Sequence, residues 1–169
     1  MFDGETMIII KDVLDQAREN SLMIATAESC TGGLIAGALT SVAGSSDVVE
    51  RGFVTYTNEA KVEMLGVDPE LINQHGAVSE QVARAMCEGA LGHSRADLAV
   101  SVTGVAGPGG GSKDKPVGTV HVAVAAQNSP TSHALLQFGD IGRGNIRHKT
   151  MLAAFSMLLE AMSGQVSTA

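Results

Sequence analysis

Ala27-Glu28-Ser29-Cys30-Thr31-Gly32-Gly33 joins the apolar run 23–27 to a helical pattern of apolar residues that begins at Leu34. A strand that ends in Ser-Cys-Thr-Gly-Gly and leads into a helix puts a hydroxyl, a thiol and several backbone N–H groups at one point. The first N–H groups of a helix have no intrahelical partner, so they can hold an anion or a developing oxyanion. The stretch therefore has two interpretations, and the first is a nucleophile beside an oxyanion-binding turn. The alternative is a plain helix cap, in which Ser29 or Thr31 bonds the helix start and the two glycines ease packing.

Composition and the order of patterns define the fold class. The chain has 169 residues, of which 44% are hydrophobic and only 17% charged, so a folded domain with a real core is expected. Helical and strand patterns alternate in the first part of the chain, whereas the last two strand patterns follow each other closely. This order predicts an α/β fold with three layers, α/β/α, and a mixed, partly antiparallel sheet.

We expect a single domain over residues 8–162, flanked by short tails at 1–7 and 163–169. Asn58 and Ser79 are the expected caps of the third and fifth helices. The patterns predict helices over 8–20, 31–41, 59–65, a short segment from Pro69, 80–92 and 145–162, and strands over 22–27, 48–57, 97–103, 119–126 and 134–138.

Charge and cysteine content exclude several classes of function. The net charge is −7 and no basic patch is present, which argues against a nucleic-acid partner. The two cysteines lack metal-ligand spacing and indicate a reducing, cytoplasmic environment rather than a disulfide scaffold. The five histidines also lack metal-ligand spacing, and no metal or other cofactor is expected. Neither a signal peptide nor an apolar run of about 20 residues is present, so no membrane association is expected. The low charge and the methionine-rich apolar content favour a homodimer or higher homo-oligomer.

The second informative motif is Tyr56-Thr57-Asn58-Glu59-Ala60-Lys61, which lies just past a predicted strand end. Ligands of α/β folds bind at such ends. Lys61 is a candidate base for a serine, provided that burial or a nearby positive charge lowers its pKa. Tyr56 is a candidate for orienting that amine or relaying the proton. The alternative is an exposed helix lysine paired with Glu59 or Glu63.

Two further segments contain residues suited to anion binding. The run Gly104–Gly118 is rich in glycine but lacks the P-loop spacing and does not open a helix, so neither of the two common nucleotide fingerprints applies. Its backbone N–H groups can line a phosphate or ribose, and the alternative is a flexible hairpin loop. Arg143 and Arg147 stand at the start of the last helix, where a bound anion would offset their charge; surface charge is the alternative.

Cys30 is a rival nucleophile, because a position at a helix N-terminus lowers the pKa of a thiol. If Cys30 is the nucleophile, iodoacetamide should abolish activity and Cys30→Ser should fail to restore it. Cys87 falls on the apolar face of a predicted helix and is expected in the core.

Together these segments resemble one family, the C-terminal domain of the competence/damage-inducible CinA proteins, over roughly residues 8–162. The resemblance rests on five motifs in order: 27–33 and 56–61 quoted above, His75-Gly76-Ala77-Val78-Ser79-Glu80, Thr103-Gly104-Val105-Ala106-Gly107-Pro108, and Lys115-Pro116-Val117-Gly118-Thr119-Val120.

The resemblance implies an amidohydrolase that acts on a small-molecule nucleotide, converting nicotinamide mononucleotide to nicotinate mononucleotide and ammonia in pyridine nucleotide recycling. It implies a serine–lysine mechanism, with no metal, on Ser29, Lys61 and Tyr56. The remaining implied roles are the oxyanion and substrate contacts (Cys30, Thr31, Gly32, Gly33, Thr103, Gly104, Ala106 and Gly107) and the phosphate contacts (Arg143 and Arg147).

The chain departs from the family pattern at one place. The family usually reads Gly-Asp-Arg before the last helix, whereas here Ile141-Gly142 separates Gly139-Asp140 from Arg143. This difference leaves open a second function, a non-catalytic nucleotide-binding module with the same pocket, which would bind nicotinamide mononucleotide without turning it over.

Overall fold

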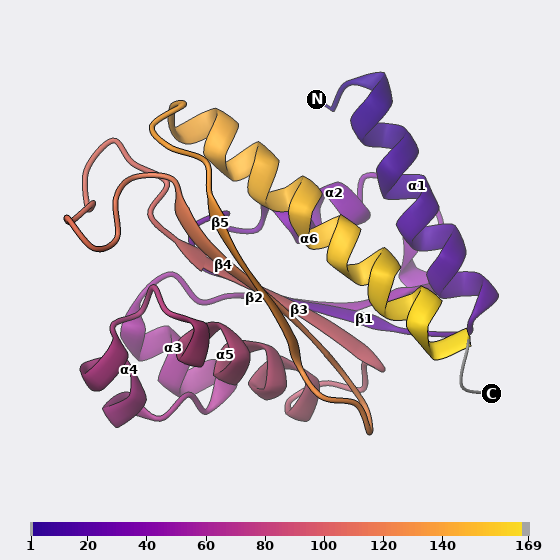
Figure 1. The fold of residues 1–169 in the computed structure, drawn as a ribbon. Coiled ribbons are helices and arrows are strands. Elements are labelled where there is room, and N and C mark those ends of the chain that lie inside the picture. Colours follow the sequence, from indigo (N-terminus) through magenta and orange to yellow (C-terminus); the bar gives the residue numbers. More distant parts are fainter. Residues whose placement is uncertain (1, 167–169) are drawn as a thin grey trace.

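A mixed sheet of five strands forms the middle layer of the computed structural model, which describes residues 2–166 (Figure 1). The strand order is β2-β1-β3-β4-β5; β1 pairs in parallel with β2 and β3, while β4 is antiparallel to both β3 and β5. The strands are β1 Ile24–Glu28, β2 Val49–Val54, β3 Leu98–Gly104, β4 Thr119–Ala126 and β5 Ser132–Gln137.

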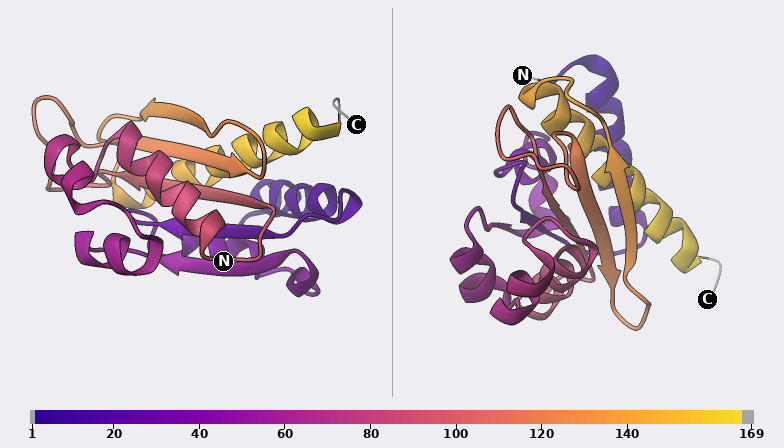
Figure 2. Two further views of the ribbon diagram at one scale, coloured as in Figure 1. Left: turned by 90° about the horizontal axis from the view of Figure 1, so that it is seen from below. Right: turned by 60° about the vertical axis from the view of Figure 1, so that its left-hand side comes forward.

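Helices cover both faces of this sheet. The helices α1, α2 and α6 lie on one face and α3, α4 and α5 on the other, so that three layers are seen when the molecule is viewed along the sheet (Figures 1 and 2). The predicted three-layer α/β/α class is therefore confirmed. The helices are α1 Gly4–Glu19, α2 Leu34–Leu39, α3 Asn58–Leu65, α4 Pro69–His75, α5 Glu80–Gly92 and α6 Arg143–Val166, with a 3-10 turn at Ser45–Asp47.

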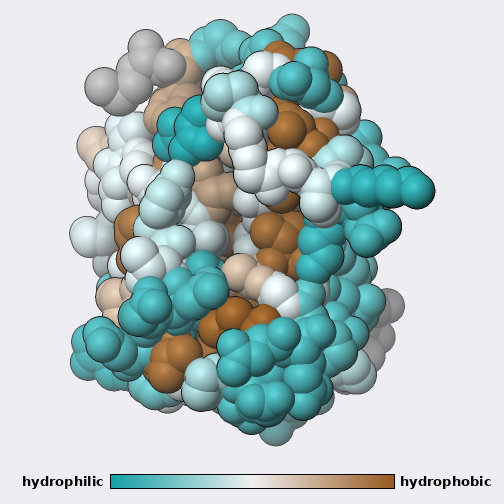
Figure 3. Space-filling model, turned by 90° about the vertical axis from the view of Figure 1, so that its left-hand side faces the viewer, coloured by the Kyte–Doolittle hydropathy of each residue, from teal (hydrophilic) through white to brown (hydrophobic). Residues whose placement is uncertain are grey.

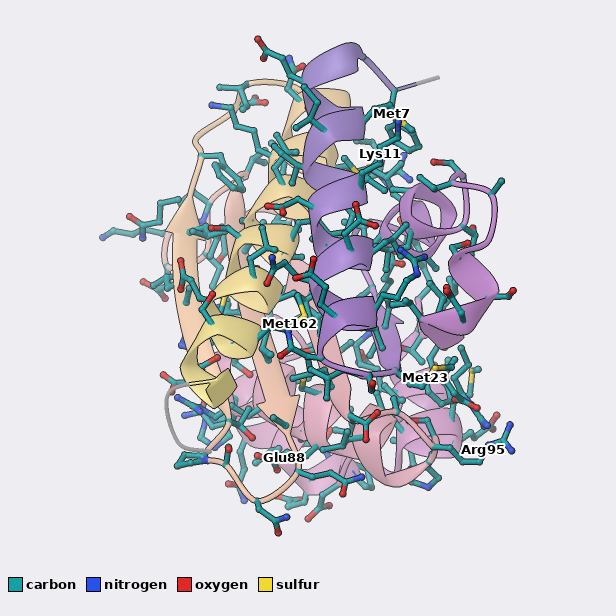
Figure 4. The ribbon with its side chains drawn as sticks, turned by 90° about the vertical axis from the view of Figure 1, so that its right-hand side faces the viewer. Met7, Lys11, Met23, Glu88, Arg95 and Met162 are labelled. Atoms are coloured by element: carbon teal, nitrogen blue, oxygen red, sulfur yellow. The ribbon has the colours of Figure 1, made fainter. Side chains whose placement is uncertain are left out.

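The two cores differ in the size of their side chains. On the α1/α6 face, β3 and β4 present valines, and α1 and α6 lie side by side over them (Figure 4). On the α5 face the strands present mainly alanines, including Ala25, Ala27, Ala99 and Ala123. Small side chains on the α5 face allow the helix to lie close to the sheet. The strand β1, which lies between β2 and β3, is buried along its whole length, as expected for a parallel strand covered on both faces.

Both predicted tails are shorter than expected. The first helix begins at Gly4 rather than near residue 8, because the Asp3 side chain accepts a hydrogen bond from the Thr6 N–H at 2.8 Å. Thr6 is itself buried, and its hydroxyl lies 3.1 Å from Nε2 of His148 on α6. At the other end α6 continues to Val166 beyond the predicted end at Met162, while residues 167–169 lie outside the described chain.

Two helix starts also differ from the predicted ones. The second helix begins at Leu34 rather than residue 31, because Gly32 and Gly33 have φ values of +59° and +91° and therefore form a turn. Thr57 caps α3 in place of Asn58, with its side chain accepting from the Ala60 N–H at 3.1 Å. Both shifts move a helix end that borders the candidate site.

Gly89 in α5 sets how closely α3 can approach. A Cβ on this glycine would overlap the carbonyl oxygen of Leu65, the last residue of α3, whereas a Cβ on Gly92 of the same helix meets nothing within 4 Å. We expect Gly89→Ala to lower the free energy of unfolding by about 2–3 kcal/mol through overpacking. Gly92→Ala should change it by less than about 1 kcal/mol, in the stabilising direction. Urea unfolding of the two variants measures both effects, and equal effects would refute this account of the α3–α5 contact.

Candidate active site

The carboxyl ends of β1, β2 and β3 open onto a cavity of about 250 Å³ on the side of the molecule that carries the glycine-rich loop and α3. Figure 3 looks onto this side, where pale and apolar residues line the hollowed middle and hydrophilic residues surround it. The cavity is lined by Ser29, Cys30, Tyr56, Asn58, Lys61, Ala77, Val78, Thr103, Gly104, Ala106 and Arg143. Four of the five motifs of the sequence analysis thus contribute to one cavity.

Ser29 and Lys61 meet at the floor of this cavity. The Lys61 Nζ atom lies 3.1 Å from Ser29 Oγ, although the two residues are 32 positions apart in the sequence. Two backbone carbonyls hold the amine from the other side, Thr55 O at 2.9 Å and Thr57 O at 3.3 Å. Lys61 is only 1% exposed and is therefore not the solvated helix lysine of the alternative interpretation.

Burial shifts the protonation equilibrium of Lys61 toward the neutral amine. Desolvation by burial lowers the pKa of Lys61 below the ordinary value for lysine, and this effect outweighs the nearby Cys30 and Glu59, which act in the opposite direction. A neutral amine has two N–H donors and one lone pair. In the neutral amine, donation to Thr55 O and Thr57 O leaves the lone pair facing Ser29 Oγ, whereas an ammonium donates to all three oxygens.

Glu28 organises the turn that follows Ser29. Its side chain is fully buried and its carboxylate accepts hydrogen bonds from the Thr31 hydroxyl at 2.6 Å and from the N–H groups of Gly33, Ile35 and Ala36 at 2.8–3.1 Å. The first N–H groups of α2 are therefore bound by a side chain rather than left free. Nothing in the sequence pattern distinguished Glu28 from an ordinary charged residue.

This arrangement narrows the candidates for an oxyanion donor. The Gly33 N–H donates to Glu28 Oε2 at 3.1 Å and the Gly32 N–H to the Ser29 carbonyl at 3.1 Å, so both are already used. Within residues 2–166, the N–H groups of Cys30 and Thr31 donate to no protein acceptor. Of the four predicted positions, Cys30 lines the cavity, whereas Thr31, Gly32 and Gly33 are not among the lining residues.

Cys30 lines the cavity but lacks the properties of a nucleophile. The sequence predicts a thiol pKa lowered by the helix N-terminus, and this prediction is wrong: burial raises the pKa of Cys30 to about 12, and the nearby Glu28 acts in the same direction. Cys87 is fully buried, as predicted, and burial likewise raises its pKa to about 12.

Tyr56 lies at the mouth of the cavity. Its side chain is more than half exposed, and its hydroxyl accepts a hydrogen bond from Arg143 Nη2 at 2.8 Å. Within the described chain the Tyr56 hydroxyl has no hydrogen bond to Lys61; the carbonyls of its two neighbours, Thr55 and Thr57, orient the amine instead.

Of the two predicted phosphate-binding arginines of α6, Arg143 lines the cavity, whereas Arg147 is not among the lining residues. Arg143 Nη1 donates to the Gly107 carbonyl at 2.9 Å, and Arg147 Nη2 donates to the Thr31 carbonyl at 2.6 Å. The buried Nε of Arg147 has no partner within the described residues. Both guanidinium groups therefore join α6 to a loop of the site.

The start of the glycine-rich loop forms another wall. Thr103 is almost fully buried and donates its hydroxyl to the Ala77 carbonyl at 2.8 Å, while Gly104 and Ala106 line the cavity. Gly107 does not line the cavity but holds Arg143 through its carbonyl. Asn58, Ala77 and Val78 also line the site; they stand in two of the quoted motifs, but the sequence analysis gave them no role in the site.

A second cavity is larger but contains no comparable chemistry. It measures about 410 Å³ and is lined by the residues that follow Lys115 in the loop together with Gln137, Gly139 and Asp140. No candidate nucleophile–base pair lies among these residues. The smaller cavity, which contains Ser29 and Lys61, is therefore the candidate active site.

Two general properties of the described chain bear on the class of protein. None of the helices within residues 2–166 combines the length and the apolar composition needed to span a membrane. In the same part of the chain, no three His, Cys, Asp or Glu side chains gather closely enough to hold a metal ion.

The chain belongs to the CinA C-terminal domain family, whose model matches residues 7–162. The nicotinamide-nucleotide amidohydrolase PncC of Escherichia coli K12 is 54% identical over 125 residues, which cover 74% of this chain and 76% of that protein. A competence-damage inducible homologue from Caldicellulosiruptor bescii is 48% identical over 94% of this chain, but the chain spans only 38% of that protein's length.

Solved structures agree with this assignment. The competence/damage inducible protein CihA from Agrobacterium tumefaciens has a TM-score of 0.93 at 53% identity, covering 96% of this chain and 98% of that chain. A CinA superfamily protein from Klebsiella pneumoniae has a TM-score of 0.89 at 31% identity, covering 94% and 98% of the two chains.

The buried Glu28 carboxylate generates a stability prediction. In Glu28→Gln one oxygen becomes an amide NH2 group, which would face backbone N–H donors in place of an acceptor. We expect a loss of about 2–4 kcal/mol in the free energy of unfolding, because hydrogen bonds to a buried charged group are lost. The exposed Glu63→Gln on α3 is the control and should change stability by less than about 0.5 kcal/mol. A neutral Glu28→Gln would show that the carboxylate does not organise this turn.

The cysteine environments predict resistance to alkylation. With both thiols buried and their pKa values raised to about 12, native protein should take up no iodoacetamide at pH 8 while urea-unfolded protein takes up two equivalents. Intact-protein mass spectrometry measures the uptake. Rapid modification of Cys30 in the native protein would contradict this prediction and restore the thiol as a candidate nucleophile.

Proposed function

We propose that this protein is an amidohydrolase that hydrolyses the carboxamide of nicotinamide mononucleotide to nicotinate mononucleotide and ammonia. The contact between Ser29 Oγ and the buried Lys61 amine is the observation that carries the proposal. The similarity to PncC of E. coli supports the substrate, because that protein is named as a nicotinamide-nucleotide amidohydrolase.

In the proposed reaction Ser29 Oγ attacks the carboxamide carbon as Lys61 accepts the hydroxyl proton. The amine becomes an ammonium, which the Thr55 and Thr57 carbonyls already face and can stabilise. The ammonium then protonates the leaving nitrogen, so ammonia departs and an acyl ester remains on Ser29. A water molecule attacks the ester, Lys61 again accepts the proton, and the proton returns to Ser29 Oγ as the acid leaves.

The oxyanion of each tetrahedral intermediate requires donors beside Ser29. We propose the Cys30 and Thr31 N–H groups for this role, because Gly32 and Gly33 already have acceptors. Glu28 contributes indirectly by fixing the turn from Ser29 to Ala36 before substrate arrives. A preorganised turn does not have to reorient as charge develops.

The remaining contacts of the site suit a nucleotide. Arg143 supplies positive charge in the cavity lining, and in this proposal it contacts the phosphate of the nucleotide together with Arg147, which holds the Thr31 carbonyl. In this proposal Tyr56 contacts the nucleotide and holds Arg143, and Thr103, Gly104 and Ala106 line the ribose.

Ammonia release from nicotinamide mononucleotide tests the function. Wild-type protein should release ammonia, whereas Ser29→Ala and Lys61→Met should each lose at least about three orders of magnitude in kcat, because nucleophile and base act as a unit. Cys30→Ala is the matched control in the same cavity and should retain activity within about tenfold. Release by Ser29→Ala at the wild-type rate would refute the mechanism. Saturable binding without turnover by the wild type would instead support a non-catalytic nucleotide-binding module.

The lowered pKa of Lys61 predicts the pH dependence of the reaction. The active form of the free enzyme holds a neutral amine, so kcat/KM should rise with pH and level off above the pKa of Lys61. Because that pKa is lowered, the plateau should begin below the ordinary lysine value of about 10.4. A kcat/KM that stays flat from pH 6 to 10, or that falls with rising pH, would contradict the assignment of Lys61 as base.

Unfolding experiments test the same shift without substrate. Since the pKa of Lys61 is lower in the folded than in the unfolded chain, the unfolded chain binds more protons between the two values. The free energy of unfolding of the wild type, relative to Lys61→Met, should therefore rise with pH through this window. A difference that does not change with pH would show that burial leaves the pKa of Lys61 unshifted.

A further inference from the structure

One wall of the cavity is a short backbone segment between two helices. Ala77 and Val78 follow the end of α4 and precede the Ser79 cap of α5, and both line the cavity. Their N–H groups donate to no protein acceptor within the described residues. Free N–H groups in a cavity wall are suited to donating hydrogen bonds to a polar substrate. These N–H groups can bind a substrate in a fixed geometry only if the backbone of the segment is itself held in place.

Three hydrogen bonds hold this segment through its carbonyl groups. From the cap of α5, the Ser79 hydroxyl donates to the Gly76 carbonyl at 2.9 Å. From the sheet, the Thr103 hydroxyl donates to the Ala77 carbonyl at 2.8 Å. From the glycine-rich loop, Lys115 Nζ donates to the His75 carbonyl at 2.6 Å, across 40 positions of sequence. Lys115 therefore supplies the only charged group of the three.

The position of Lys115 suits this role. The His75 carbonyl is at the C-terminal end of α4, where a cation interacts favourably with the helix dipole. A Cβ on Gly76 would lie 3.0 Å from Lys115 Nζ, which shows how closely the ammonium approaches the backbone there. Gly76 has a φ of +75°, so a side chain is disfavoured at this position on two counts.

The turn of the glycine-rich loop that contains Lys115 is held by hydrogen bonds of its own. The Lys115 N–H donates to the Ser112 hydroxyl at 3.0 Å, and the Lys115 carbonyl accepts from the Ser112 N–H at 3.0 Å. Three residues further on, the Gly118 N–H donates to the Val105 carbonyl at 2.8 Å, next to Gly104 and Ala106 of the cavity wall. The hydrogen bond from Lys115 to the His75 carbonyl thus joins this turn to the C-terminal end of α4.

We propose that Lys115 is a positioning residue that ties the glycine-rich loop to the segment 75–78, so that two walls of the cavity bind substrate as one unit. The proposal rests on the proposed function for its substrate, nicotinamide mononucleotide. Lys115 does not line the cavity and acts through the backbone of Ala77 and Val78. Its loss weakens substrate binding and leaves the chemistry of Ser29 and Lys61 in place.

Lys115→Met tests this role, because methionine keeps an apolar stem of similar length and removes the donor. Its KM for nicotinamide mononucleotide should rise about tenfold, with kcat within about twofold of wild type and an unchanged pH dependence of kcat. Lys115→Arg, which restores a donor and the charge, should recover most of the loss. Lys113→Met removes the same charge from an exposed position of the same loop and should leave KM unchanged. An unchanged KM in Lys115→Met, or a loss in kcat alone, would overturn the proposal.

Amide hydrogen exchange tests the link without turnover. The Gly76 and Gly118 N–H groups, which donate to Ile72 and Val105, should exchange about tenfold faster in Lys115→Met than in wild type or Lys113→Met. Gly76→Ala gives a second variant that disturbs the contact while keeping the lysine, and it should raise KM in the same way. If the wild type releases no ammonia, the proposed function fails, while the exchange rates still decide whether Lys115 ties the two segments together. Equal exchange in all variants would overturn the link itself.

Discussion

Burial of the Lys61 amine beside Ser29 is the constraint on which the candidate site depends. A lysine side chain taken out of water is costly as a cation, so burial lowers the pKa of Lys61, which is the direction that its proposed role as the base for Ser29 requires. The backbone carbonyls of Thr55 and Thr57 satisfy the amine without adding a negative charge that would raise its pKa again. A carboxylate in their place would favour the ammonium and remove the base.

The sheet topology explains why these groups meet. Three parallel strands bring the ends of β1, β2 and β3 to one edge, where Ser29, Thr55 and Thr103 follow or end their strands. The antiparallel strand β4 then returns the chain from the glycine-rich loop, so that this loop lies over the same edge. Glu28 completes the arrangement by accepting hydrogen bonds from N–H groups at the start of α2, next to the turn that Gly32 and Gly33 form.

Periodicity predicted the fold class and most elements, whereas the pairing of Ser29 with Lys61, which are 32 positions apart, came from the resemblance to the CinA family. Helix starts were less predictable: Asp3 caps α1 five positions before the expected start, and the conformations of Gly32 and Gly33 delay α2. The reactivity of Cys30 was predicted wrongly, because the helix N-terminus is visible in the sequence whereas the burial that dominates its pKa is not. The role of Lys115 depends on a contact across 40 positions of sequence, and that of Glu28 on the burial of its carboxylate against the turn that follows it; the sequence pattern shows neither.

The protonation state of Lys61 decides between this account and a structural role for the buried lysine. A titration of the lysine side chains by NMR, with Lys61→Met used to assign the Lys61 signal, measures that state directly. The account predicts that the assigned signal titrates clearly below the ordinary lysine value of about 10.4. A signal that titrates at or above that value would mean that Lys61 is an ammonium near neutral pH and cannot act as the base for Ser29.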